Sequence, residues 1–191
     1  MVDLPATAAY RHLGVRDGFE VLFLRRGGDG YHLEGHSAGI ENGEMWSIRY
    51  ALTLDGSWVT RTAQIVGRSA AGAHEVRLDG DGTGGWLVDG RPAPRLAGCL
   101  EVDLEASAFT NAIPVHRLDL DVGQRAEAPA AWVRVPDLRV ERLEQRYVRL
   151  EDDAERQRYD YAAPDLDFTA ELTYDEFRLV LEYPGMAVRV A

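Results

Sequence analysis

Alternation of apolar and polar residues over Trp46–Leu54 constrains the fold of this chain more than any other feature of its sequence. A period of two is typical of a strand with one buried face. The dipeptide Asp55-Gly56 follows directly, and Asp-Gly is a strong signal for a two-residue hairpin loop. The alternating apolar positions are Trp46, Ile48, Tyr50, Leu52 and Leu54. The sequence therefore predicts a β-hairpin with one apolar face.

A two-residue loop would also fix the register of this hairpin. Leu54 would face Ser57, Leu52 would face Val59, and Tyr50 would face Arg61. Arg61 would then lie on an otherwise apolar face, where a charge must be paired or hydrogen-bonded. One interpretation is an arginine that snorkels or forms an ion pair at a sheet edge. The other is a polar anchor in an apolar cavity, holding the oxygen-rich head group of a ligand.

The same alternation recurs elsewhere in the chain. The segments 168–174 and 177–183 predict a second hairpin around the weaker turn Asp175-Glu176. The segment 140–150 fits either a helix or a strand. Further strands are expected at Phe19–Leu24, Tyr31–Gly39, His74–Leu78, Trp86–Val88, Gly98–Leu104 and Val115–Val122.

Many short strands separated by glycine-rich turns predict a mainly β fold with at most short helices, in the form of a sandwich, roll or barrel. The 191 residues suit one domain, and no shift in composition marks an internal boundary. We therefore expect a single β domain over residues 1–191. In the strand 98–104, Glu101 and Asp103 are expected on the polar face.

Charge and composition narrow the choice of partners. The formal net charge is −11, and all 21 basic residues are arginine. An acidic surface disfavours nucleic acid and anionic membranes. No apolar run approaches the roughly 20 residues of a membrane span, so stable membrane insertion is not expected. The segment Met1–Pro5 lacks the features of a signal peptide, and a cytoplasmic location is expected.

Several short motifs resemble catalytic or metal sites but are best explained as ordinary strands and turns. Gly35-His36-Ser37-Ala38-Gly39 matches the nucleophile elbow, but that motif needs a strand-to-helix turn, and here a turn leads into another strand. The segment 79–84 resembles the start of a calcium loop but lacks the glutamate at its twelfth position, so a plain turn is expected. Asp119 and Asp121 would share a solvated strand face. No catalytic residue, metal site or cofactor is predicted.

The segment Gly98–Leu118 carries the most specific pattern in the chain. It resembles the bacterial putative glycolipid-binding family, whose pattern reads approximately G-C-x-D-V-D-L, a short spacer, and S-P-x-T-N-x-L-P-I-R-R-L. The flanking segments 84–90, 131–133, 136–138, 145–147 and 182–185 agree with it, as does the hairpin at 50–61. Glu101, Ala108, Ala112 and His116 depart from the pattern. If the paired arginines form a head-group clamp in that family, only Arg117 remains fully charged here.

This resemblance implies a highly curved antiparallel sheet, a spiral β-roll or half-open barrel similar to the bacterial lipoprotein-carrier proteins. The leading hypothesis is a non-enzymatic protein that holds a glycolipid or another amphiphile in a concave apolar cavity. The expected ligand-binding residues are Trp46, Ile48, Tyr50, Arg61, Trp86, Asn111, Arg117 and Tyr147. Two alternatives remain: an enzyme acting on a sugar or lipid in the same cavity, with Asp103 or Asp119 as a base, and a homodimeric interaction module.

Overall fold

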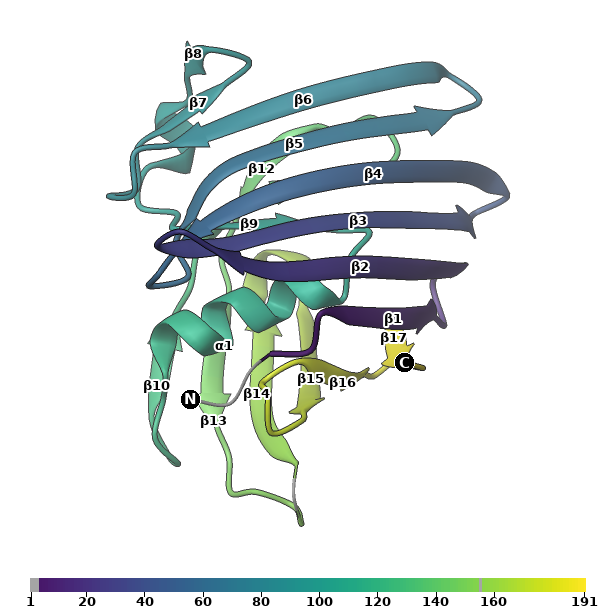
Figure 1. Cartoon of the computed structure of the whole chain (residues 1–191). Helices are drawn as coiled ribbons and strands as arrows, with labels where there is room; N and C mark the ends of the chain where they lie inside the picture. Colours follow the sequence, from purple (N-terminus) through teal and green to yellow (C-terminus); the bar gives the residue numbers. More distant parts are fainter. Residues whose placement is uncertain (1–3, 155) are drawn as a thin grey trace.

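The computed structural model describes residues 4–154 and 156–191. Residues 1–3, which belong to the expected domain 1–191 and to the segment Met1–Pro5, lie outside the described residues. Within the described part, the chain forms one large antiparallel sheet of 14 strands, a second sheet of three strands, and one short α-helix. The expectation of a mainly β fold with a curved sheet is confirmed (Figure 1).

The large sheet is assembled from strands at both ends of the chain. Its order is β10-β13-β14-β15-β16-β17-β1-β2-β3-β4-β5-β6-β7-β8. The N-terminal strands are β1 (Thr7–His12), β2 (Asp17–Gly27), β3 (Gly30–Glu41), β4 (Glu44–Asp55), β5 (Thr60–Ser69), β6 (Gly72–Gly80), β7 (Trp86–Val88) and β8 (Arg91–Pro92). The remaining strands are β10 (Arg125–Glu127), β13 (Arg146–Arg149), β14 (Gln157–Ala163), β15 (Phe168–Tyr174), β16 (Val180–Tyr183) and β17 (Ala187–Arg189).

Strand β1 joins the two halves of this sheet. It pairs with β2 on one side and with the C-terminal strand β17 on the other. The strands β10 and β8 end the sheet and are not paired with each other, so the roll stays open. In Figure 1 the long strands β2–β6 run side by side, and β13–β16 lie below them.

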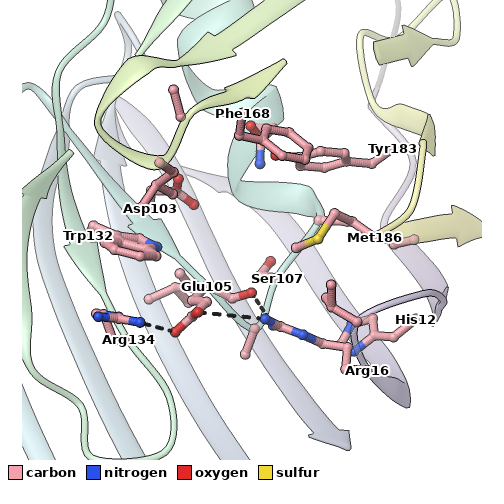
Figure 2. A pocket seen from close by; sticks show the side chains of 18 of the residues that line it. His12, Arg16, Asp103, Glu105, Ser107, Trp132, Arg134, Phe168, Tyr183 and Met186 are labelled. Atoms are coloured by element: carbon pink, nitrogen blue, oxygen red, sulfur yellow. Dashed lines mark hydrogen bonds and ion pairs between the residues drawn. The ribbon is translucent and has the colours of Figure 1, made fainter. Parts of the chain in front are cut away.

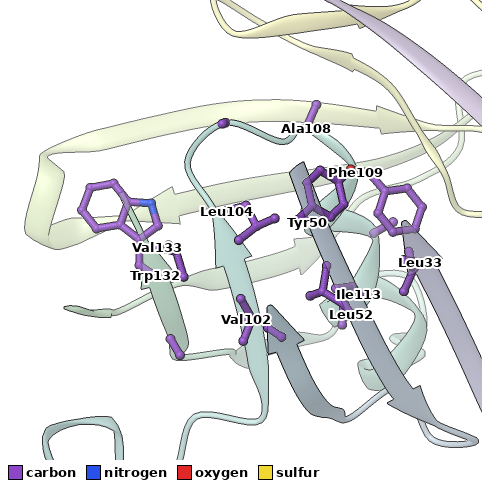
Figure 3. Close-up of a cluster of buried hydrophobic side chains, with 14 of the residues drawn as sticks. Leu33, Tyr50, Leu52, Val102, Leu104, Ala108, Phe109, Ile113, Trp132 and Val133 are labelled. Carbon is purple, nitrogen blue, oxygen red and sulfur yellow. The ribbon is translucent and has the colours of Figure 1, made fainter. Parts of the chain in front are cut away.

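The three-stranded sheet lies against the inner face of the large one. It has the order β12 (Val140–Leu143), β11 (Ala130–Val133), β9 (Glu101–Leu104). Its β9 and β11 strands are parallel, which is an exception to the antiparallel expectation. Figure 3 shows Val102 and Leu104 of β9 close to Tyr50 and Leu52 of the large sheet. All four residues of β9 are buried, so the expected division of this strand into an apolar face and a polar face with Glu101 and Asp103 is wrong.

The short helices fill the space beside this second sheet. They are η1 (Pro94–Leu96), η2 (Phe109–Asn111), α1 (Ala112–Leu118) and η3 (Pro164–Leu166). Helix α1 replaces the strand expected at Val115–Val122. Pro114 lies in its first turn, where a missing N–H costs no hydrogen bond, and Asp119 ends it in the left-handed conformation with φ 45°. Asp119 is therefore exposed at a helix end and does not form the strand-face pair expected with Asp121.

The hairpin between β4 and β5 has strands where expected but a different register. Tyr50 pairs with Ile65, and Leu52 pairs with Ala63. Four residues, 56–59, separate the two strands instead of two, and a bulge shifts the pairing between Thr53 and Leu54. Within this loop the Asp55 carboxylate accepts the N–H groups of Ser57 and Val59. Trp58 adopts a left-handed φ of 65° and closes the loop. The expected pairing of Tyr50 with Arg61 is wrong for this reason.

Two other loops repeat this arrangement. Asp175 and Asp81 each accept two N–H groups, from the second and fourth residues after them. The third residue after each aspartate, Arg178 or Gly84, has a positive φ. The loop after Asp81 is the segment that resembles a calcium loop, and the aspartate there organises the turn itself.

The register places Arg61 away from the apolar face. Its side chain is 44% exposed and lies 3.7 Å from the Asp55 carboxylate. The inner face beside Tyr50 is packed with Phe109 and Ile113 (Figure 3). The prediction that this hairpin wraps a hollow around Arg61 is therefore wrong, and the hollow of the protein lies elsewhere.

Candidate functional site

A cavity of about 280 Å³ opens where the N-terminal and C-terminal parts of the sheet meet. Its walls come from β1 and the following loop, from β9 and the loop after it, and from β11, β12, β14, β15, β16 and β17. Figure 2 shows Trp132 and Asp103 on one side of the cavity and His12, Arg16 and Met186 on the other. The volume equals that of about nine water molecules, which suits one sugar ring or a short segment of an acyl chain.

One wall of the cavity is apolar and rich in aromatic rings. Phe168 and Tyr183 lie with their ring centroids 5.9 Å apart, and Tyr161 packs edge-on against each of them. Trp132 stands across the cavity from this cluster (Figure 2). The aliphatic lining residues are Val15, Leu104, Leu143, Leu166 and Met186, with Ala106, Ala108, Ala163 and Ala187 between them. Aromatic faces of this kind stack on the C–H surface of sugars and on alkyl chains.

The opposite side carries a network of charges centred on Glu105. The Arg16 guanidinium is buried and lies 3.2 Å from Glu41 and 3.7 Å from Glu105. It also donates a hydrogen bond to the Glu105 backbone carbonyl. Arg134 approaches Glu105 to 3.8 Å and Glu141 to 3.7 Å, with its guanidinium 4.6 Å from the centre of the Trp132 ring. Each arginine thus has carboxylate partners, and the network offers donors and acceptors with little excess charge.

Asp103 lies at the bottom of the cavity, and the side chains that hydrogen-bond to it are uncharged. Its Oδ1 accepts a hydrogen bond from the Thr110 hydroxyl at 2.8 Å, and its Oδ2 accepts one from Gln145 at 2.5 Å. The same Gln145 nitrogen lies 3.0 Å from the Tyr161 hydroxyl. Burial raises the pKa of the Asp103 carboxyl to about 6, and the two hydrogen bonds oppose this rise. Near neutral pH this group is close to its titration point.

The loop 105–111 forms the floor of the cavity and is anchored to the large sheet by Glu20. One Glu20 oxygen accepts the Ala108 N–H at 3.0 Å, and the other accepts the Tyr50 hydroxyl at 2.6 Å. Glu20 is fully buried, and burial raises the pKa of its carboxyl to about 7. His12, the last residue of β1, also lines the cavity. It is uncharged near neutral pH, because burial and the nearby Arg16 lower its pKa to about 4.

Asn111 is the sequence-predicted residue that lines this cavity. Its side-chain oxygen accepts the Tyr147 hydroxyl at 2.9 Å, and its backbone carbonyl accepts the Tyr174 hydroxyl at 3.2 Å. Tyr147 therefore positions Asn111 from behind.

The other predicted ligand residues lie apart from the cavity. Trp46 sits behind the charged network, with the Arg16 guanidinium 5.7 Å from its ring centre. Ile48 and Tyr50 are packed in the core of the large sheet. Trp86 donates its indole N–H to the Cys99 carbonyl at 2.8 Å. The structure thus does not bring the eight predicted residues together in one site.

Arg117 is also engaged within the protein. It forms two hydrogen bonds with the buried Glu101, at 2.8 and 2.9 Å. The residue before it, His116, stacks on Trp58 with ring centroids 3.7 Å apart. Burial lowers the pKa of His116 to about 3, with a smaller contribution from Arg178. Neither side chain is placed as a head-group clamp.

Sequence reasoning missed the charged network of Arg16, Glu105 and Arg134. These residues come from three distant segments, so no local spacing reveals that they meet. One local signal existed: Trp132 lies in β11 and Arg134 directly follows that strand, and a spacing of two residues places an aromatic ring and a guanidinium on one face. Figure 2 shows these two side chains together.

Residues 4–154 and 156–191 contain no group of three or more His, Cys, Asp or Glu side chains that could hold a metal ion. No helix in this part of the chain is long and apolar enough to cross a membrane.

An open antiparallel β-roll with an amphipathic cavity is the class of protein that this fold and site define. The family model described as putative glycolipid-binding matches residues 7–189. The chain belongs to this family, as its resemblance to the family pattern predicts.

Two solved structures share the fold. A crystal structure of a DUF1089 family protein from Pseudomonas aeruginosa is similar with a TM-score of 0.76 and 34% identity, over 90% of this chain and 92% of that one. A β-barrel-like protein of the domain of unknown function DUF1849 from Brucella abortus is similar with a TM-score of 0.52 and 11% identity, over 96% of this chain and 93% of that one. This second likeness concerns the fold alone. No curated protein matches the chain.

Proposed function

We propose that the chain binds an amphiphile with an uncharged, hydroxyl-rich head group, such as a glycolipid, in the cavity between Trp132 and Tyr183. The observation that carries this proposal is the division of the cavity into an aromatic wall and a charged network. Apolar burial of the ligand would supply affinity, while a few placed polar groups would orient it. The family name points to the same class of ligand.

The balance of charge favours a neutral head group over an anionic one. Arg16 and Arg134 already have carboxylate partners, so an added phosphate would meet Glu105 and Glu41 as well as the guanidinium groups. A sugar hydroxyl both donates and accepts hydrogen bonds, and it can use both members of an ion pair. The side-chain amide of Asn111, which lines the cavity, adds a further donor.

Titration calorimetry with monomeric octyl glucoside tests this proposal, with a cavity-filling variant beside its control. Ala163→Leu adds volume to the cavity wall, because Ala163 lines the cavity. Ala162→Leu adds the same volume on the other face of β14, where Ala162 lines a shallow outer groove. We expect binding by the wild type and by Ala162→Leu, and at least tenfold weaker binding by Ala163→Leu. Equal affinities for all three proteins, or no binding by the wild type, would refute the proposal.

The raised pKa of Asp103 favours one competing function, an enzyme acting on a sugar or lipid in the same cavity. A carboxyl that titrates near pH 6 could exchange a proton with a bound substrate. Both Asp103 oxygens are held by Thr110 and Gln145, which favours a structural role. Release of chromogen from aryl glycosides decides between them. Turnover that Asp103→Asn abolishes would support the enzyme, and its absence at high protein concentration would support binding alone.

A further inference from the structure

A second groove crosses the outer face of the large sheet, away from the cavity. It has a volume of about 430 Å³ and lies over β2, β3, β4, β5 and β6. These five strands run side by side in Figure 1. The lining residues are Phe19, Val21, His36, Ser37, Ala38, Ser47, Ile48, Arg49, Val66, Gly67, Arg68 and Ala73, with no carboxylate among them. In a chain of net charge −11, a groove without acidic residues is unusual.

Three nitrogen-bearing side chains converge in this groove through the register of the strands. His36 pairs directly with Arg49 across β3 and β4. Arg68 pairs with Ser47, two residues before Arg49 on β4, which makes the two arginines diagonal neighbours on the same face. Within the described residues, neither Arg49 nor Arg68 has a carboxylate within 4.0 Å. Like charges placed this close repel each other, and a bound anion would relieve that repulsion.

Two acidic side chains that adjoin the groove, Glu34 beside His36 on β3 and Glu75 opposite Val66 on β6, have partners of their own. Glu34 lies 3.6 Å from the guanidinium of Arg25. Glu75 accepts a hydrogen bond from Gln64 at 2.9 Å. The two arginines of the groove therefore keep their donors free for a ligand, unlike the ion-paired arginines of the cavity.

Apolar side chains continue the groove beyond the arginines. Phe19 is 46% exposed, although it is large and apolar. It lies in one cross-strand row with Ala38, Ser47 and Arg68, while Val21 and Val66 lie in the adjacent row with His36 and Arg49. A phosphate or carboxylate on the guanidinium groups would leave an attached alkyl chain against Phe19 and Val21.

We propose that this outer groove is a second ligand site, which takes a phosphate or carboxylate group carrying an apolar chain. Arg49 and Arg68 bind the anion, His36 adds a donor, and Phe19 with Val21 contacts the chain. The site is independent of the cavity, since the two share no lining residue.

Titration calorimetry with octyl phosphate at moderate salt tests this site, with inorganic phosphate as a second arm. The double variant Arg49→Gln/Arg68→Gln should bind octyl phosphate at least tenfold more weakly than the wild type. Arg91→Gln/Arg125→Gln is the matched control: both arginines are exposed, lie outside the groove and form no ion pair in the described part of the chain. It changes the net charge equally and should keep the affinity.

Phe19→Ala separates the two possible sources of the anion. This variant should bind octyl phosphate more weakly than the wild type and should bind inorganic phosphate with unchanged affinity. If the wild type itself bound both ligands equally weakly, the groove would be a site for free anions without a pocket for the chain, and this would contradict the proposal. No binding of octyl phosphate, or equal loss in both double variants, would overturn it. Ala163→Leu should not affect this titration, so its outcome is distinct from that of the cavity.

Discussion

Arg117 binds the buried Glu101 through two parallel hydrogen bonds, from Nε to Oε2 at 2.8 Å and from Nη2 to Oε1 at 2.9 Å. Glu101 lies on β9 and Arg117 on α1, so the pair fastens the helix to the inner sheet. The carboxylate is 1% exposed and the guanidinium side chain 14% exposed. The arginine that the family pattern suggests for a head group is thus occupied inside the protein.

Loss of this arginine should lower stability and leave ligand binding unchanged. Arg117→Gln leaves the buried Glu101 carboxylate without its charged partner, and we expect a loss of about 3–5 kcal/mol in the free energy of unfolding. The double variant Glu101→Gln/Arg117→Gln should recover part of this loss, because no charge is left buried. Urea unfolding measures both. If Arg117→Lys kept full stability but lost affinity for octyl glucoside, Arg117 would be a ligand residue after all.

Ionisation of Glu20 should make the stability of the fold depend on pH. Its pKa is about 7 in the folded chain against 4.5 for a glutamate exposed to water, so the unfolded chain releases this proton first as pH rises. The stability that Glu20 contributes is complete below pH 4.5 and is lost as pH rises through 7. Glu20→Gln should therefore match the wild type near pH 4 and exceed it at pH 8 by up to about 3 kcal/mol.

Urea unfolding at both pH values provides the check on Glu20. Glu75→Gln is the control, since Glu75 is exposed on the outer face of the sheet, and it should change either value by less than about 0.5 kcal/mol. A gain for Glu20→Gln that is equal at pH 4 and pH 8 would show that the carboxyl does not titrate in this range.

Substitutions of Arg134 and Arg61 test where the ligand binds. Both are partly exposed and ion-paired, at 34% and 44% side-chain exposure, but only Arg134 lines the cavity. Arg134→Gln should weaken octyl glucoside binding about tenfold, since a hydrogen bond to a charged group is worth about 1.5–3 kcal/mol. Arg61→Gln should leave the affinity unchanged. Weaker binding by Arg61→Gln with unchanged binding by Arg134→Gln would instead place the ligand at the β4–β5 hairpin.

The whole chain should unfold in one transition. We propose that it is a single domain, because β1 pairs with both β2 and β17 and so links the two halves of the sheet. Tryptophan fluorescence and far-ultraviolet circular dichroism should give the same urea midpoint. Two separate midpoints would show that the N-terminal and C-terminal strands unfold independently. The possible homodimer also remains a prediction, and light scattering would test it.

The sequence predicted strand positions well where one face is buried. The alternation over Trp46–Leu54 matches the burial of β4 residue by residue. It failed at β9, where both faces are covered and Glu101 and Asp103 are buried with partners from α1 and the neighbouring loops. It also failed at 115–122, because a short helix and an alternating strand place apolar residues at similar spacings.

The site was harder to predict than the fold. A longer turn and a bulge set the register of the β4–β5 hairpin: Asp55 organises a four-residue loop, and the bulge at Arg61 leaves that side chain out of the apolar face. The charged network depends on β1 meeting the loop after β9, a contact between residues about 90 positions apart such as Arg16 and Glu105, which hydrogen-bond with a separation of 89. No periodicity in the sequence carries that information.

The most direct test of the binding account is a crystal structure of the chain with a selenium-linked octyl glucoside. The account predicts an anomalous selenium peak inside the cavity between Trp132 and Tyr183, with sugar hydroxyls within hydrogen-bond distance of Arg134 or Asn111. A peak in the outer groove or at the β4–β5 hairpin, or an empty cavity at saturating ligand, would contradict it.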